Sequence, residues 1–303
     1  MTRTQANIML VAIAVIWGLA FVFQKTAMEH IGPFTFLTMR ALIACLVLAP
    51  IAILYENASR ADRPHAGFWM IATAGGATFF IGGILQQIGL VTATVTNTGF
   101  LTGLYVFITP LLMWLVLSRP PSALIWAAVI LAFVGTWLLG GGTIGGFSRG
   151  DWLVVFSSFF WAAHMLVIEH SGRHARPIAF TAVQFAVVAL VSGGAALALE
   201  DVSLDGLAGA IPEIAYVGLL SSALTFTLLA FAMRHTTAAE ATIIVSLETV
   251  FAAVAGVILL AERLEWIGWF GAALMFSASV LVQVAPFIRT KGATSPAPPP
   301  SQP

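Results

Sequence analysis

Glu248 and His164 are titratable side chains that lie well inside apolar stretches of this 303-residue sequence. A carboxyl or imidazole group at such depth can take up and release a proton, as the proton relays of membrane proteins do. The same group can instead hydrogen-bond a neighbouring helix and serve only packing; for Glu248 the partner would be Arg40 or Lys25. The sequence leaves both roles, proton coupling and helix pairing, open for Glu248 and for His164.

Aromatic and amide side chains share helix faces in the same kind of stretch. Trp17, Phe21 and Gln24 are spaced i, i+4 and i+7, which places them on one face of a helix. The matching face of a later stretch carries Trp161 and Met165. Aromatic walls with a few neutral hydrogen-bonding groups suit an amphipathic solute that carries a ring or an alkyl group.

Further residues are predicted to complete this solute site. Phe79 and Gln86 share one helix face, while Tyr105 and Ser246 supply hydroxyl groups that can orient the polar end of a solute. An aromatic residue in a membrane helix can equally face lipid, which is the competing interpretation for each ring. The predicted substrate-binding residues are Trp17, Phe21, Gln24, Phe79, Gln86, Asn97, Tyr105, Trp161, His164, Met165 and Ser246.

Two glycines and a proline mark the second part of the stretch 66–118 as a hinge. Gly99 and Gly103 lie one helical turn apart, and Pro110 removes a backbone donor further along. Small residues at this spacing also let two helices approach closely. The sequence therefore predicts a hinge at Gly99, Gly103 and Pro110, with close packing as the alternative.

The composition indicates what kind of molecule carries these residues. Of the 303 residues, 59% are hydrophobic and 9% are charged, whereas a soluble globular domain has about 25% charged residues. So little polar surface cannot cover a soluble core of this size, and we expect an integral membrane protein with the lipid bilayer as its partner. The formal net charge is zero, so the balance gives no sign of a nucleic-acid partner.

Apolar stretches of about 20 residues can cross a bilayer as helices, and the sequence divides into ten of them. The stretch 66–118 carries no charged side chain and is too long for one crossing, so we expect two crossings with TATVTNT as the turn. The predicted spans are Thr4–Gln24, Pro33–Tyr55, two within Ala66–Ser118, Pro120–Gly140, Trp152–Ile168, Pro177–Leu199, Ile214–Met233, Ala241–Ala261 and Trp266–Ile288.

Positive charges predict the orientation, because short cytoplasmic connectors of membrane proteins are rich in arginine and lysine. With the N-terminus inside, the inner connectors hold Arg3, Arg60, Arg63, Arg119, Arg173, Arg176, Arg234, Arg289 and Lys291. The outer connectors and helix ends hold only Lys25, Arg40, Arg149 and Arg263. Both termini are therefore predicted to be cytoplasmic, and the proline-rich end, 289–303, is predicted to be a disordered cytoplasmic tail.

The two halves of the sequence repeat one pattern. VIWGLAFVFQK at 15–25 and FFWAAHMLVIE at 159–169 both have tryptophan in third place and end at a charge, and Pro33 matches Pro177 at the same offset of 144. Pro110 is matched to Thr249, which implies an insertion of a few residues in the second half.

Each half holds five predicted helices, an odd number, so the second copy must enter the membrane from the opposite side. The predicted fold is an all-α polytopic membrane protein with ten transmembrane helices arranged as two inverted-topology five-helix repeats. The repeats are 1–140 and 151–288, joined by a loop at 141–150. Such repeats are typical of secondary transporters with a solute site near the membrane midplane.

The sequence resembles the EamA-type branch of the drug/metabolite transporter (DMT) superfamily over residues 7–288. The resemblance rests on VIWGLAFVFQK and on SLETVFAAVAGVILLAERLEWIGWFGAALMFSASVLV, where the family has a ninth helix similar to LEPVFAA…LGE. Thr249 stands where the family has proline. Within this branch the chain is most similar to the YddG-type exporters of aromatic and hydrophobic amino acids.

The resemblance implies a multi-pass protein of the bacterial inner (plasma) membrane that exports an amino acid or a related small metabolite by alternating access, with the two halves rocking about a midplane site. A monomer and a homodimer both fit. The nearer alternative is a polyspecific drug or metabolite efflux carrier, because Glu248 could attract a cation.

An intramembrane enzyme is the remote alternative. No H-E-x-x-H pair indicates zinc chemistry and no Walker sequence indicates ATP hydrolysis, so no metal and no cofactor is expected. Phosphate-bearing solutes need cations deep in the pathway, whereas Lys25 and Arg40 are predicted to lie toward one end of it. The function predicted from the sequence is thus transport, not catalysis.

Overall fold

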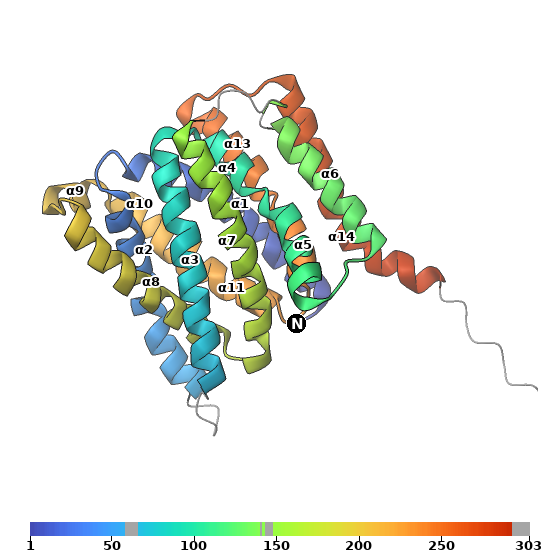
Figure 1. Ribbon diagram of the computed structural model, residues 1–303, viewed down its shortest axis with the longest axis horizontal. Helices are drawn as coiled ribbons and strands as arrows, with labels where there is room; N and C mark the ends of the chain where they lie inside the picture. The colour runs from blue at the N-terminus through green and yellow to red at the C-terminus, as the bar shows by residue number, and fades with distance from the viewer. Residues whose placement is uncertain (58–65, 140, 143–147, 293–303) are drawn as a thin grey trace, which may run out of the picture.

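The computed structural model describes residues 1–57, 66–139, 141–142 and 148–292 of the chain, with side chains as far as Val282. Throughout these residues the regular structure is helical, and no strand occurs among them. The helices pack side by side into one bundle (Figure 1). The last helix continues through Gly292, so the first residues of the predicted tail are helical, and 293–303 lie outside the described residues.

The elements follow one another in this order: α1 (Arg3–Ala27), α2 (Pro33–Ile51), η1 (Ala52–Asn57), α3 (Ala66–Thr92), α4 (Val95–Thr102), α5 (Tyr105–Leu117), α6 (Ala123–Leu139), α7 (Arg149–Ser171), η2 (Gly172–His174), α8 (Pro177–Leu199), α9 (Leu204–Gly209), α10 (Ile211–Ala215), η3 (Tyr216–Leu224), α11 (Thr225–Ala232), α12 (Ala238–Val245), α13 (Glu248–Leu260) and α14 (Trp266–Gly292). Two of these, η1 and η3, are π-helical and continue α2 and α10 without a gap.

Eight of the described helical stretches are long and apolar enough to cross a membrane. Two more, Ala123–Leu139 and Trp266–Val282, are apolar but shorter over the residues described. The predicted double crossing of 66–118 is present, because α3 ends at Thr92 and α4 begins at Val95, within TATVTNT. The structure thus shows a polytopic helical protein.

Large apolar side chains cover much of the outer surface of the bundle. Leu197 and Leu190 on α8 are 82% and 79% exposed, and Met70 on α3 is 72% exposed. In water such side chains would form extended apolar patches, which soluble monomers rarely carry. A surface of this kind is stable when lipid tails cover it, in agreement with the apolar composition.

Corresponding helices of the two halves begin and break at nearly constant offsets. The helices α2 and α8 begin at Pro33 and Pro177, and a proline at the first helical position needs no backbone donor. The helix pairs α4–α5 and α12–α13 break at corresponding places, since α5 begins at Tyr105 and α13 at Glu248, 143 positions later.

The same offset relates the ends of α5 and α13, which terminate before Ser118 and Ala261. Both of these residues have a left-handed backbone conformation with positive φ. In this register Thr249, the second residue of α13, corresponds to Val106, the second residue of α5. The matching of Pro110 to Thr249 is therefore wrong, and no insertion is required between these two helices.

The most extensive helix packing joins the two halves of the chain. In this packing α3 lies against α7, α6 against α14, α2 against α8 and α1 against α13. Gly18 on α1 permits the last of these contacts, because a Cβ there would meet the carbonyl oxygen of Glu248 at 2.8 Å and the nitrogen of Ala252 at 2.9 Å. The bundle core is therefore shared between the halves.

Two carboxylates reinforce the packing of α2 on α8. Glu56, at the end of η1, accepts hydrogen bonds from the backbone nitrogens of Ile178 and Ala179 at 3.0 and 2.8 Å, at the start of α8. Glu200, just after α8, accepts from the nitrogens of Phe34 and Thr35, both at 2.8 Å, at the start of α2. Each carboxylate satisfies backbone donors at a helix N-terminus in the other half, where the helix dipole favours negative charge.

Candidate functional site

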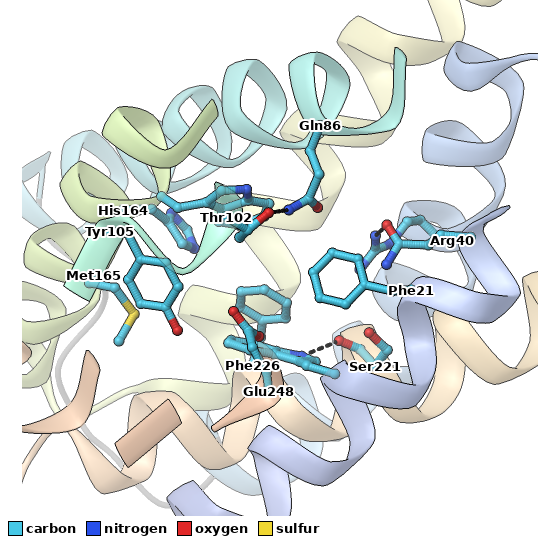
Figure 2. A pocket seen from close by; sticks show the side chains of 13 residues that line it. Phe21, Arg40, Gln86, Thr102, Tyr105, His164, Met165, Ser221, Phe226 and Glu248 are labelled. Atoms are coloured by element: carbon cyan, nitrogen blue, oxygen red, sulfur yellow. Dashed lines mark hydrogen bonds between the residues drawn. The ribbon is translucent and has the colours of Figure 1, made fainter. Parts of the chain in front are cut away.

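A cavity lies in the bundle between helices of the two halves, with about 510 Å³ of empty space including its opening. Figure 2 shows the side chains around it. The lining residues are Trp17, Phe21, Gln24, Arg40, Gln86, Thr102, Tyr105, Trp161, His164, Met165, Ser221, Phe226 and Glu248.

Trp17 is fixed in the wall by its indole nitrogen. Its Nε1 donates to the carbonyl oxygen of Ser221 at 3.0 Å and to the hydroxyl of Thr225 at 2.7 Å. Ser221 belongs to the π-helical segment η3, where the wider turn leaves a carbonyl oxygen available to a side chain. Short π segments are uncommon and occur often at functional sites, in agreement with the position of η3 on the cavity.

Aromatic rings form a continuous wall around the tryptophans. The ring of Phe226 lies 4.7 Å from that of Trp17 and 6.4 Å from that of Trp161, measured between centroids. Behind this wall Phe79 meets Phe226 and Trp161 edge to face at 5.0 and 5.1 Å. Phe79 is fully buried and does not line the cavity, so it supports the wall from the second layer.

Arg40 brings a positive charge to the cavity. Its Nε donates to the hydroxyl of Ser222 at 3.0 Å and its Nη1 to the amide oxygen of Gln24 at 3.4 Å, and its Cζ lies 5.5 Å from the centre of the Phe79 ring. The side chain is only 4% exposed. Arg40 was predicted to lie toward one end of the pathway, but its long side chain extends from the first turns of α2 to the cavity wall, where it is buried.

Glu248 brings a carboxyl group to another part of the cavity wall. It is the first residue of α13, where the helix dipole stabilises a carboxylate, and it is 4% exposed. The hydroxyl of Tyr105, the first residue of α5, lies beside it (Figure 2). The breaks before α5 and α13 thus direct two polar side chains toward one space.

Two further lining residues have a polar atom without a hydrogen-bond partner in the part of the chain described. These atoms are the indole Nε1 of Trp161 and the Nε2 of His164, both buried. The Nδ1 of His164 lies 3.0 Å from the hydroxyl of Thr78 and shares a hydrogen bond with it. Buried polar atoms without partners are costly, so a bound molecule that supplied partners would be stabilised here.

The structure brings most of the predicted solute-site residues together, and three lie elsewhere. The predicted residues on the cavity are Trp17, Phe21, Gln24, Gln86, Tyr105, Trp161, His164 and Met165. Phe79 lies behind the wall, Asn97 lies near the start of α4, and the Ser246 hydroxyl is bonded to the carbonyl oxygen of Ile243 at 2.8 Å. Helical spacing in the sequence does not distinguish a side chain that lines a cavity from one that lies in the layer behind it.

Five lining residues lie outside the predicted substrate-binding set. Glu248 was predicted for proton coupling or helix pairing, and the other four are Arg40, Thr102, Ser221 and Phe226. A signal existed for Arg40, since a cation inside an apolar stretch is costly and usually functional. Another existed for Ser221, which lies in the hydroxyl-rich run SSALTFT. Thr102 is bonded to the Gln86 amide at 2.8 Å, a contact that no sequence pattern indicates.

The predicted hinge residues occupy three different settings. Gly103 lies at the break between α4 and α5, Gly99 one turn earlier, and Pro110 inside α5, which continues to Leu117. A Cβ at Gly103 would lie 2.6 Å from Thr249 Cγ2, so this glycine also permits close packing against α13. The break is real, and motion about it stays a prediction.

The chemistry available at the cavity is that of binding. Its polar groups are one guanidinium, one carboxyl group, amides, hydroxyls, two indoles and an imidazole. Over the described ranges, no three or more His, Cys, Asp or Glu side chains come together as metal ligands. The cavity therefore has the means to hold a small molecule with both apolar and polar parts.

The expectation that the sequence contains no serine-nucleophile motif is wrong, and the motif has a structural explanation. The run GFSRG at 146–150 has the G-x-S-x-G spacing of a serine nucleophile. Ser148 is instead the N-cap of α7: its hydroxyl accepts from the nitrogen of Asp151 at 3.1 Å and donates to the Asp151 carboxylate at 2.8 Å. This capping box fixes the start of α7, and the Ser148 hydroxyl is used for both of its hydrogen bonds.

Comparison with protein families gives one family, which matches the chain in two successive regions. Together the two regions cover nearly the whole chain. The model of the EamA-like transporter family matches residues 4–141 and again residues 148–284. The two matches coincide with the two sets of helices that recur at the offsets above.

Two relatives and one solved structure are similar over much of the chain. An uncharacterized transporter of Archaeoglobus fulgidus is 31% identical over 288 residues, 93% of this chain and 87% of its own. The uncharacterized transporter YvbV of Bacillus subtilis is 26% identical over 200 residues, 63% of each chain. A protein crystal structure matches 97% of this chain and 100% of its own with a TM-score of 0.73 at 14% identity, a likeness of fold.

Proposed function

The chain belongs to the EamA-like transporter family, and we propose that it exports aromatic or hydrophobic amino acids and related small metabolites. The observation that carries the proposal is the cavity itself, which combines an aromatic wall with one buried cation and one buried carboxylate. An amino acid with a ring or a branched chain presents the complementary groups: an apolar part, a carboxylate and an ammonium.

We place the protein in the inner membrane of a bacterium with ten transmembrane helices, five per inverted repeat, and both termini in the cytoplasm. Eight long apolar helices, two shorter ones and the twofold family match support this arrangement. Two ion pairs support the placing of their segments on one side of the membrane. Arg3 pairs with Glu240 at 2.8 Å and Arg119 with Glu169 at 3.4 Å, and in both pairs the partners come from segments assigned to the cytoplasmic side.

Transport would proceed by alternating access to the cavity. The moving bodies each contain helices from both halves of the chain, because the packing of α3 on α7, of α6 on α14 and of α2 on α8 joins the halves most extensively. Rocking one whole half against the other would break these contacts. The break between α4 and α5 at Gly103 is the proposed hinge, since it lies next to the cavity residues Thr102 and Tyr105.

Efflux of lipophilic drugs is the second candidate function, and Glu248 is the observation that favours it. A buried carboxylate attracts a cationic drug. Arg40 lines the same cavity and repels such a cation, so the pair of charges fits a solute with both signs better than one with a single positive charge.

The proposal is tested with purified protein in liposomes and labelled phenylalanine, tryptophan, threonine and a nucleotide sugar. We expect saturable movement of phenylalanine and tryptophan, reduced at least tenfold by Trp161→Ala. Trp266→Ala is the matched control, because Trp266 is 78% exposed and far from the cavity wall. Movement of a nucleotide sugar or a lipophilic cation, with none of the amino acids, would overturn the substrate class.

A further inference from the structure

Arg40 and Glu248 are a basic and an acidic side chain on one cavity, and they do not pair with each other. Arg40 and Glu248 both belong to the described part of the chain, and they form no ion pair with each other within 4.0 Å. Figure 2 shows the Arg40 guanidinium and the Glu248 carboxylate apart, with the ring of Phe21 drawn between them. The contacts of Arg40 are to the neutral groups of Ser222, Gln24 and Phe79.

Two unpaired charges inside a membrane protein are costly, and their cost is offset when each meets a charge of opposite sign. The guanidinium of Arg40 uses Nε and Nη1 for Ser222 and Gln24, and its Nη2 makes no hydrogen bond with a described residue. The two bonds hold the planar group in place, so the remaining donor edge is ready for a carboxylate. Glu248, with the hydroxyl of Tyr105 beside it, offers acceptors for an ammonium group.

The repeat makes these two positions distinctive. The position equivalent to Arg40 in the second half, 144 residues later, is Gln184, and the position equivalent to Glu248 in the first half is Tyr105. A scaffold with the same side chains in both halves would accept a solute in two orientations. Each charge replaces a neutral side chain in one half only, so the cavity is polarised and selects one orientation.

We propose that Arg40 receives the carboxylate and Glu248, with Tyr105, the ammonium group of a single zwitterionic solute, an α-amino acid. The inference rests on the proposed function and goes beyond it by assigning one residue to each charged end. The solute's side chain then lies against Trp161 and Phe226, the aromatic wall.

The test measures binding of three solutes that differ only in their charged groups: phenylalanine, phenethylamine, which lacks the carboxylate, and 3-phenylpropionate, which lacks the ammonium. Dissociation constants come from ligand-induced thermal stabilisation of the full-length protein in detergent. The variants are Arg40→Gln and Glu248→Gln. Arg263→Gln, which removes an exposed charge after α13, is the matched control.

We expect the native protein to bind phenylalanine at least about 30-fold more tightly than either analogue. In Arg40→Gln the ratio of the dissociation constant of phenethylamine to that of phenylalanine falls toward one, while the same ratio for 3-phenylpropionate stays high. In Glu248→Gln the ratio for 3-phenylpropionate falls toward one and the ratio for phenethylamine stays high. A variant that is merely misfolded weakens all three solutes together, so this crossed pattern separates recognition from folding.

The inference is overturned if Arg40→Gln unfolds at the same temperature as the native protein without ligand and yet weakens all three solutes equally, or if it leaves the preference over phenethylamine unchanged. Its failure differs from failure of the proposed function, which is decided by the native protein alone in liposomes. Transport of phenylalanine without the crossed pattern overturns only the assignment of the charges. The crossed pattern without transport upholds the assignment and overturns the exporter.

Discussion

Tyr105 and Glu248 begin α5 and α13 at corresponding places in the two halves, and their side chains lie beside each other on the cavity. Each follows a break in a long apolar helix, at 103–104 and at 246–247. Non-helical backbone at membrane depth is tolerated where it lines a cavity or is buried in protein. The two breaks therefore place the polar side chains of Tyr105 and Glu248 on the cavity, within otherwise apolar helices.

Glu248→Gln is expected to remove any effect of an imposed pH gradient on phenylalanine flux, because glutamine cannot take up or release a proton. His164→Gln should keep the effect, since the Nδ1 of His164 is already bonded to Thr78 within the protein. The measurement is flux in liposomes with and without the gradient. A Glu248→Gln protein that responds as the native one does would exclude Glu248 as the proton-carrying group.

Trp17→Phe and Trp161→Phe are expected to have different effects, although the two tryptophans are equivalent in the repeat. Trp17→Phe breaks two hydrogen bonds within the protein and should lower the free energy of unfolding by about 1–2 kcal/mol. Trp161→Phe removes an indole nitrogen that has no partner in the described chain, so stability should hold and affinity for phenylalanine should fall severalfold. The measurements are thermal unfolding and KM for phenylalanine. Equal losses of stability in the two variants would contradict the different roles of the two tryptophans.

Glu200→Ala is expected to destabilise the fold by about 1–3 kcal/mol, because three donors at the start of α2 lose their charged acceptor. Glu56→Ala should act in the same way at the start of α8. Asp201→Ala is the control, since Asp201 is adjacent to Glu200 and exposed. Thermal unfolding in detergent measures each change. Equal midpoints for Glu200→Ala and Asp201→Ala would show that these caps contribute little.

Gly18→Ala is expected to destabilise the protein by about 1–3 kcal/mol and to weaken solute binding, because the new methyl group would press on α13 at Glu248 and Ala252. Gly194→Ala is the matched control within a helix, since a Cβ there meets no atom within 4 Å. Unfolding midpoints and phenylalanine affinity are measured for both. A Gly18→Ala protein that binds normally would show that α1 can move away from α13 without disturbing Glu248.

Much of the fold and part of the site could be predicted from residue order. Apolar stretches of the right length located the helices, and the turn before Val95 fell where TATVTNT places it. Helical spacing put Trp17, Phe21 and Gln24 on one face, and all three line the cavity. Such predictions succeed because bilayer thickness and helix periodicity act on each segment by itself.

Tertiary structure decided what depends on a neighbouring helix. The spacing of Phe79 is as suitable as that of Trp161, yet Phe79 lies behind the wall because Trp161 and Phe226 occupy the surface in front of it. Arg40 reads as a charge near a helix end, but Ser222 and Gln24, from two other helices, direct its guanidinium into the cavity. Sequence determined which face of each helix is polar or aromatic; the packing of helices from both halves determined which of those faces meet around one space, because that depends on contacts between residues far apart in the chain.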